Sequence, residues 1–320
     1  MKHLLLLAAA GLLLASCRKA DVIVCDPTPA DSLSLADFTR RNSAPVQAFS
    51  LAVGTTTTLT TQAGTTLVFP GNGFILPSGA AATGTAEVRV REIRSVPEMV
   101  LANMPTTVAV TRQLLVSGGE FSIQVWQGAS RLRLKFTSTP LGTATGLALQ
   151  TPIRAEQDIT PQLLWQQPAK LLASPISDST GWVLRDTLRA QVPSFYRTLI
   201  PLDSIGWWNI DQLWHRYLNN TTVEVQVATP ATEPGDTRVF LRPVGYNGLA
   251  RLPSPVAGSA RTRWAYSLPI GVEMIAVVLQ SVQGQLYYGT QRLTSQSGLV
   301  VTPPLVAVSE AEAVRLIRQL

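Results

Sequence analysis

The sequence predicts an all-β protein with two β-sandwich-like domains, joined by a proline-rich connector and followed by a short C-terminal α-helix. Glycine and proline are frequent, at 22 residues each among 320, and only 14% of the residues are charged. Short runs of alternating apolar and polar residues recur between turn signals. This combination is typical of sheets with many turns and unusual for a helical protein.

The first sixteen residues are expected to be a lipoprotein signal peptide. Lys2 precedes the apolar stretch 4–15, which is shorter than the roughly 20 residues of a membrane-spanning helix but has the length of a cleaved signal. The stretch ends in Leu14-Ala15-Ser16-Cys17, the order of a lipobox. We therefore expect cleavage after residue 16 and lipidation of Cys17. An ordinary signal peptide followed by a chance cysteine is the alternative.

Residues 17–45 are expected to form a lipidated stalk, because prolines lie among scattered Asp and Ser residues. One or two helical turns fit residues 31–41. Cys25 lies in this segment, and with Cys17 lipidated it has no partner for an intramolecular disulfide. We interpret Cys25 as a tether residue, with pairing to another chain as the alternative. Arg18 follows the cysteine in place of the aspartate that often signals inner-membrane retention, so an outer-membrane location in the cell envelope is expected.

The first β-sandwich domain is expected over residues 46–137. Residues 86–93 alternate, with Ala86, Val88, Val90 and Ile93 expected on one face. Gly118-Gly119 reads as a turn between two strands. Residues 121–126 and 131–136 flank the turn 127–130 and predict a hairpin. Strands at this spacing are typical of a sandwich.

Residues 138–180 are expected to form the connector, because they contain five prolines and many Thr, Ser and Gln residues. The second β-sandwich-like domain is then expected over 181–320, with Gln283-Gly284 as a tight hairpin turn. In the segment 205–217, Trp207, Ile210, Leu213, Trp214 and Tyr217 recur at helical spacing. This spacing favours a short amphipathic helix or turn.

The chain is expected to end in a helix over residues 310–319. Ser309 and Glu312 form a capping box. Acidic residues lie early in this segment, whereas Arg315 and Arg318 lie late, which matches the helix dipole.

The sequence offers little for catalysis, and we expect no catalytic residue, metal or cofactor. His215 is the single histidine after signal cleavage, and no G-x-S-x-G motif accompanies it. One histidine and a tether cysteine are too few for a zinc site. Phosphate-binding loops are absent, and Asp203, Asp211 and Asp236 are isolated and form no calcium loop.

Paired carboxylates are the remaining route to an enzyme, a carboxylate-dependent glycan hydrolase. The candidates in the first domain are Glu87, Glu92, Glu98 and Glu120. Glu87 and Glu92 have opposite strand parity and are not expected to share a face. We interpret these residues as surface residues.

An aromatic cluster is the candidate binding site: Trp207, Trp208, Trp214 and Tyr217. Exposed aromatic side chains stack on sugar rings or anchor protein partners. The alternative is that they fill a core or a domain interface. Nucleic acid is not an expected partner, because the 26 Lys and Arg residues are dispersed and the net charge is only +6.

Several segments carry a resemblance: Phe69-Pro70-Gly71-Asn72-Gly73-Phe74, Thr83–Val88, Met99–Thr106, Leu114–Phe121, Gly206–Asp211, Leu268–Gly271 and Ser309–Leu320. In these segments the chain resembles a group of cell-envelope lipoproteins of the Bacteroidota. The resemblance implies β-sandwich modules and an envelope location, with no established reaction. Members often have Cys where this chain has Ile210. The first block also resembles the sandwich domain of ankyrins and netrin receptors, an interaction module, although fold analogy does not assign function.

Together these observations predict a lipid-anchored envelope protein that acts as a non-enzymatic interaction or scaffold module. Its expected partners are the membrane, reached through the lipid, and an envelope protein or glycan. A carbohydrate-binding surface lipoprotein that uses the aromatic cluster is the main alternative.

Overall fold

The computed structural model describes residues 33–135, 146–153, 163–167, 181–187, 190–192, 195–200, 207–214, 219–228, 237–252, 256–257, 259 and 262–320. The signal peptide, Cys17, Cys25, His215 and Tyr217 lie outside these ranges. Within them the chain is all-β, as the sequence predicts, and its three short helices include one, Val96–Ala102, that was not predicted from the sequence. None of these helices is long and apolar enough to cross a membrane.

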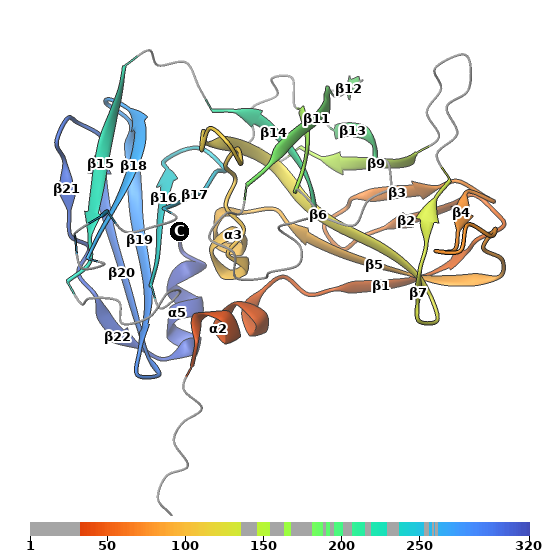
Figure 1. Ribbon diagram of the computed structural model, residues 1–320, viewed down its shortest axis with the longest axis horizontal. Coiled ribbons are helices and arrows are strands. Elements are labelled where there is room, and N and C mark those ends of the chain that lie inside the picture. The colour runs from red at the N-terminus through yellow and green to blue at the C-terminus, as the bar shows by residue number, and fades with distance from the viewer. Residues whose placement is uncertain are drawn as a thin grey trace, which may run out of the picture. The chain divides into compact units, whose positions relative to one another are not determined.

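Two sheets form the first sandwich (Figure 1). The larger sheet has the order β1 (Gln47–Ala52), β5 (Thr85–Ile93), β6 (Leu115–Gln127), β14 (Trp207–Leu213), β10 (Leu163–Gln166) and β11 (Val183–Thr187), and β7 (Ser130–Arg131) pairs with β6. The second has the order β12 (Ala190–Val192), β13 (Phe195–Ile200), β9 (Leu147–Pro152), β3 (Thr66–Phe69) and β2 (Thr57–Thr60). A short pair, β4 (Phe74–Ile75) and β8 (Arg133–Leu134), lies beside them. Apolar side chains of both sheets, among them Leu67, Val88 and Trp208, share one core.

Strand β5 shows how alternation directs side chains to two different cores. Ala86, Val88 and Val90 point into the core of the first sandwich, whereas Ile93 belongs to a separate cluster. The expectation that Ile93 shares their face is wrong, because an odd-numbered residue of this strand points to the other side of the sheet. Glu92 has the parity of the core residues and is buried.

The second sandwich follows in the chain. Its smaller sheet has the order β18 (Arg263–Pro269), β15 (Asn220–Gln226) and β21 (Val300–Val301). Its larger sheet has the order β17 (Ala250–Leu252), β16 (Thr237–Pro243), β19 (Glu273–Val282), β20 (Gln285–Thr294) and β22 (Val306–Val308). Residues of both sheets, including Val225, Trp264 and Val278, form its core. The predicted turn between β19 and β20 is confirmed, because Gln283 and Gly284 have φ angles of 51° and 81° and so provide the left-handed pair of a type I′ turn.

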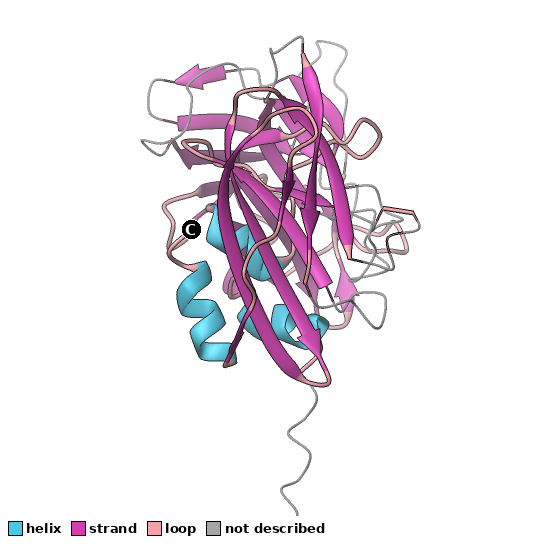
Figure 2. Cartoon of the chain, turned by 90° about the vertical axis from the view of Figure 1, so that its left-hand side faces the viewer, coloured by secondary structure: helices cyan, strands magenta, loops and turns pink. Residues whose placement is uncertain are grey.

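The three helices form a layer that contacts both sandwiches. These are α2 (Leu35–Asn42), α3 (Val96–Ala102) and α5 (Glu310–Ile317), drawn in cyan in Figure 2. Their buried residues share one cluster with Ile93 and Trp165 of the first sandwich and with Phe240 and Leu279 of the second. We call this cluster the helix layer. The C-terminal helix is confirmed, and its Ser309 cap accepts a hydrogen bond from the Glu312 amide at 3.2 Å.

Helix α2 corrects the predicted extent of the stalk. Phe38 is fully buried in the helix layer. The Ser281 hydroxyl donates to the Leu33 carbonyl at 2.5 Å, and Arg41 forms an ion pair with Glu310 of α5 at 3.0 Å. Residues 33–45 are therefore part of the folded body, because the apolar side of this helix needs a surface to cover it.

Strand pairing does not follow the predicted connector. Strands β9 and β10 lie between residues 138 and 180 and pair with β13 and β14 from beyond it. Strand β14 in turn pairs with β6. The first sandwich thus takes in strands up to Leu213, and the second begins at β15. Strands β9 and β10 are short and lie among prolines, so their residues show no clear alternation of apolar and polar side chains. The sequence pattern therefore did not indicate that they belong to the first sandwich.

Candidate functional site

The predicted aromatic cluster does not form. Residues 207–213 are strand β14, and the expected helix is wrong. Neighbouring residues of a strand point to opposite faces, so Trp208 lies in the core of the first sandwich, 1% exposed, while Trp207 packs half-buried against the helix layer. Tyr217 lies outside the described residues. A sugar-stacking surface that uses Trp208 is excluded.

Trp214 retains a partly exposed aromatic neighbour. Its ring lies 6.0 Å from that of Tyr246, with the planes inclined by 62°. Tyr246 is 42% exposed, and Trp214 packs half-buried against the second core. This pair leaves part of its aromatic surface accessible to a ligand.

The candidate carboxylates occupy separate environments. Glu87 is exposed and binds Arg89 at 2.5 Å, while Glu92 faces the core, so the predicted opposite faces are confirmed. Glu98 accepts hydrogen bonds from the amides of Arg94 and Ser95, at 2.6 and 3.0 Å, at the start of α3. Glu92 and Glu120 are buried, so their expected surface position is wrong. No two of these four residues form an open carboxylate pair.

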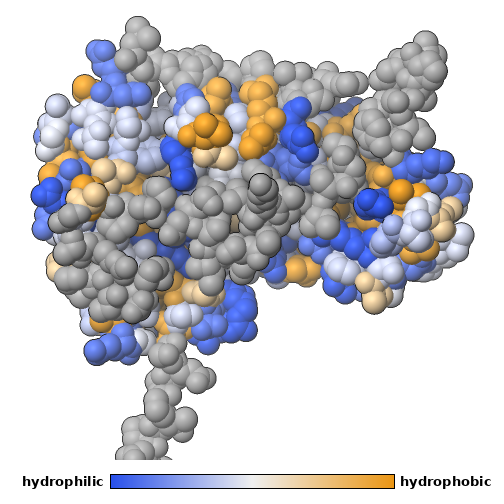
Figure 3. All heavy atoms as spheres, in the orientation of Figure 1, coloured by the Kyte–Doolittle hydropathy of each residue, from blue (hydrophilic) through white to orange (hydrophobic). Residues whose placement is uncertain are grey.

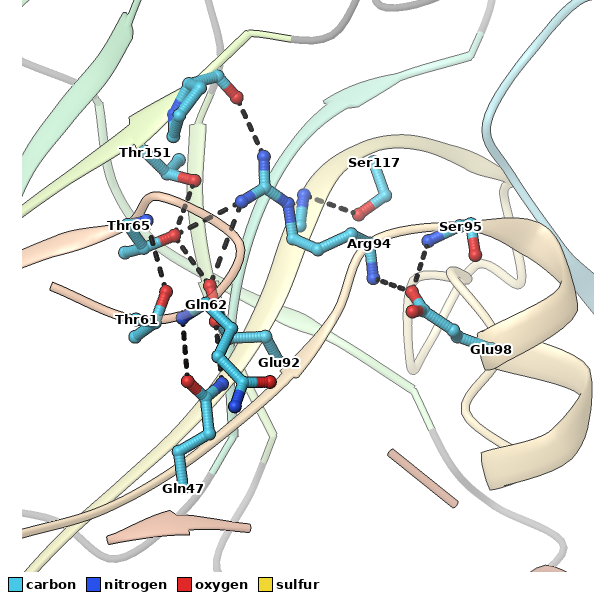
Figure 4. A network of polar contacts seen from close by, with 12 residues as sticks. Gln47, Thr61, Gln62, Thr65, Glu92, Arg94, Ser95, Glu98, Ser117 and Thr151 are labelled. Atoms are coloured by element: carbon cyan, nitrogen blue, oxygen red, sulfur yellow. Dashed lines mark hydrogen bonds and ion pairs between the residues drawn. The ribbon is translucent and has the colours of Figure 1, made fainter. Parts of the chain in front are cut away.

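Arg94 fastens the two sheets of the first sandwich together (Figure 4). Its guanidinium donates to the Thr65 hydroxyl at 3.2 Å and to the Pro152 carbonyl at 2.7 Å, and lies 3.8 Å from the Glu92 carboxylate. It also lies 5.8 Å from the centroid of the Phe121 ring. The pair is buried, so removal of one partner leaves an uncompensated charge in the interior.

Thr65 and Gln47 complete the network around Glu92. The Thr65 hydroxyl contacts the Glu92 carboxylate at 2.6 Å and the Thr151 hydroxyl at 2.9 Å, and the Gln47 amide donates to Glu92 at 3.2 Å (Figure 4). These contacts satisfy both carboxylate oxygens of Glu92. The network is a structural clamp with no free reactive group.

A second cluster of polar residues lies on the opposite face of the larger sheet. Fewer of its polar atoms have hydrogen-bond partners than in the network around Glu92. Glu120 of β6 is the cross-strand neighbour of Asn209 of β14, and Ser117 that of Asp211. Glu120 also pairs with Ile93, and Asn209 with Trp165, both residues of the helix layer. We call Ser117, Glu120, Asn209 and Asp211 the polar island, because apolar neighbours surround it.

A β-bulge makes the island possible. Between Ile210 and Asp211 the register shifts, so Gly118 and Gly119 take up an extra position. The predicted turn at Gly118-Gly119 is therefore wrong, since β6 continues through it from Leu115 to Gln127. A Cβ on Gly118 would lie 2.7 Å from the Tyr196 ring, so glycine is required there by close packing.

The hydrogen bonds of the island leave three carboxylate oxygens unsatisfied. The Ser117 hydroxyl donates to the Asn209 side-chain oxygen at 2.9 Å, and the Asn209 amide donates to Asp211. Both oxygens of Glu120 and the Oδ1 atom of Asp211 have no hydrogen-bond partner in the described part of the chain. Both acids are fully buried, at 0% exposure.

Burial dominates the electrostatics of the island. It raises the pKa of Glu120 well above its usual range, and the charges of Asp211 and Glu98 raise this pKa further. Burial likewise raises the pKa of Asp211, while the nearby Ser117 side chain opposes the shift in part. Folding therefore makes the protonated form of both carboxyl groups more favourable than it is in the unfolded chain.

The island borders a hydrogen-bonded seam between the two sandwiches. The Asn247 side chain, in the turn between β16 and β17, donates to the carbonyls of Arg94 and Ser117 at 3.1 and 2.8 Å. The Thr106 hydroxyl donates to the Leu115 carbonyl and accepts from the Leu249 amide, both at 2.9 Å. We call these contacts of Asn247 and Thr106 the seam.

Sequence reasoning missed the island because its acids are far apart in the chain. The available signal was the alternation of polar Asn209 and Asp211 with apolar Trp208 and Ile210, which indicates a strand. Among the described residues, no group of three or more His, Cys, Asp and Glu is placed to hold a metal ion. No protein-family model and no curated protein matches the chain.

Proposed function

We propose that the chain is a lipid-anchored protein of the cell envelope that acts as a non-enzymatic interaction or scaffold module. The observation that carries the proposal is the position of α2. Leu33, bound to Ser281, lies only 16 positions after the predicted lipidation site, Cys17. A chain of that length reaches at most about 55 Å, so lipid on Cys17 would hold the body close to the membrane.

The membrane part of the proposal is tested by Cys17→Ser. The unsubstituted protein is expected in the membrane fraction and the variant in the soluble fraction, because the variant has no sulfur to acylate. Cys25→Ser is the matched control and is expected to stay in the membrane fraction. Membrane retention of Cys17→Ser would contradict the anchor.

Exposed apolar side chains support a protein partner. Val110 is 87% exposed, and Leu184 on the edge strand β11 is 49% exposed. The two segments are adjacent, because the Ala109 amide donates to the Trp182 carbonyl at 2.9 Å. On the face drawn in Figure 3, hydrophobic residues reach the surface among hydrophilic ones. Apolar patches on a protein surface often mark interaction sites.

Leu184→Asp tests the protein-partner role. In crosslinking on intact cells, this variant is expected to lose an adduct that the unsubstituted protein forms. Val306→Asp, on an exposed residue of the second sandwich, is the matched control and is expected to keep the adduct. Equal adduct formation by both variants would contradict a contact at β11.

Carbohydrate binding is the second candidate, supported by Trp214 and Tyr246. A half-exposed aromatic pair offers a π-face to a sugar ring. A glycan array is expected to show binding that Trp214→Ala abolishes. Trp126→Ala, which removes a half-buried tryptophan near Arg89, is the control and should leave the binding intact. Binding unaffected by Trp214→Ala would exclude this pair as the sugar site.

A further inference from the structure

We propose that Glu120 and Asp211 form a pH-sensitive catch between the two sandwiches, in which both carboxyl groups are protonated while the seam is closed and release their protons to water when it opens. This inference concerns the folded body and does not depend on the lipid anchor. It rests on the polar island and on its connection to the seam.

Within the part of the chain that the structure describes, no cation contributes to the electrostatics of Glu120 or Asp211. The charged groups that act on Glu120 are Asp211 on β14 and Glu98 on α3, both acidic. The guanidinium of Arg94 is bound to Glu92, Thr65 and Pro152. From β5 and β10 the neighbours are the apolar Ile93 and Trp165, and the turn between β16 and β17 offers the neutral Asn247.

Glu120 and Asp211 are diagonal neighbours on the adjacent strands β6 and β14. Ionising both of them in the protein interior would cost much free energy. Repulsion between them adds to the cost of removing each charge from water. Protonation removes the charge from carboxylate oxygens that have no hydrogen-bond partner in the described part of the chain, and so lowers the cost of burying them. The buried geometry thus favours the protonated pair independently of any nearby base.

Ser117 transmits the state of the island to the seam. Its hydroxyl binds Asn209 inside the island, while its backbone amide donates to the Asn247 carbonyl at 2.7 Å and its carbonyl accepts from the Asn247 side chain at 2.8 Å. We expect water that hydrates an ionised Glu120 or Asp211 to disturb these bonds, because Ser117 belongs to both the island and the seam. Ionisation is therefore expected to weaken the seam before either sandwich core is exposed.

Carboxyl titration followed by NMR, with hydrogen exchange at the seam, tests the proposal. Between pH 6 and pH 9, the protection of the Ser117 and Leu249 amides, corrected for intrinsic exchange, is expected to fall about tenfold or more. Amides in β5 should keep their protection. In Glu120→Gln/Asp211→Asn the seam is expected to stay protected at both pH values, whereas Glu87→Gln should behave like the unsubstituted protein.

Two results would overturn the catch. One is a titration in which Glu120 and Asp211 are already ionised at pH 6. The other is a loss of seam protection in the double variant as large as in the unsubstituted protein. The titration needs no substitution, so it decides the question even where the double variant does not fold.

Discussion

Ser117 and Asn247 exchange two hydrogen bonds across the seam, one at 2.7 Å from the Ser117 amide and one at 2.8 Å to its carbonyl. Each residue comes from a different sandwich. The contact therefore fixes how the strand that carries Glu120 meets the turn between β16 and β17. The local stability of the seam therefore depends on the two hydrogen bonds between Ser117 and Asn247.

Asn247→Ala is expected to destabilise the protein by about 2–4 kcal/mol. The substitution leaves the buried carbonyls of Arg94 and Ser117 without their donor, at a cost of about 1–3 kcal/mol each. Urea unfolding measures the difference. Asn219→Ala, at an exposed position, is the control and should change stability by less than about 0.5 kcal/mol. Equal effects of the two substitutions would show that the seam is not a stabilising contact.

Glu120→Gln is expected to stabilise the protein at pH 7 and to have little effect near pH 4. The folded-state pKa of Glu120 is raised, so the folded protein keeps a proton that the unfolded chain loses above pH 4.3 or so. Stability therefore falls as the pH rises from there toward the folded-state pKa. The glutamine removes this dependence, as urea unfolding at a series of pH values would show. An unchanged pH dependence in the variant would contradict this assignment.

Glu92→Gln is expected to have the opposite sign and to cost about 3 kcal/mol, because it leaves Arg94 buried without its counter-charge. Comparison with Glu120→Gln at pH 7 is direct, since both substitutions replace a buried glutamate by its amide. Glu224→Gln removes the partner of Arg263 from a partly exposed ion pair and should cost less than about 1 kcal/mol. Stabilisation by Glu92→Gln would show that the clamp is not a favourable ion pair.

Gly118→Ala is expected to destabilise the protein by about 1–3 kcal/mol, because the added methyl group would overlap the Tyr196 ring and lie 2.9 Å from the Ile210 carbonyl. Thermal unfolding measures the effect. Gly54→Ala is the control, since its nearest neighbour would be Asn72 Oδ1 at 3.8 Å. Comparable melting temperatures for the two variants would contradict the close packing at the bulge.

Local sequence patterns predicted the elements that have one buried face and one exposed face. Strand β5 has one exposed face and alternates clearly, and α5 carries its capping signals in adjacent residues. Strand β14 lies between β6 and β10 and is largely buried. Its residues alternate between apolar and polar from Trp208 to Asp211, but Trp207, Ile210 and Trp214 also recur at a spacing that fits a helix.

The polar island could not be predicted from short sequence segments, for a different reason. Ser117 and Asn209 are 92 positions apart, and their contact depends on a register shift that no short segment encodes. The same holds for the burial of Glu120, which depends on the helix layer that covers it. The sequence alone predicts a stalk over residues 33–45, because the surface that covers α2 comes from α3, α5 and β19, elsewhere in the chain.

The intact mass of the membrane-bound protein tests the central proposal most directly. The proposal predicts a chain that begins at Cys17 and carries a diacylglyceryl group, with further acylation at its amino terminus. Cys17→Ser should show no such species. A membrane-bound chain with an unmodified Cys17, or a mature chain that begins at another residue, would contradict the lipid anchor.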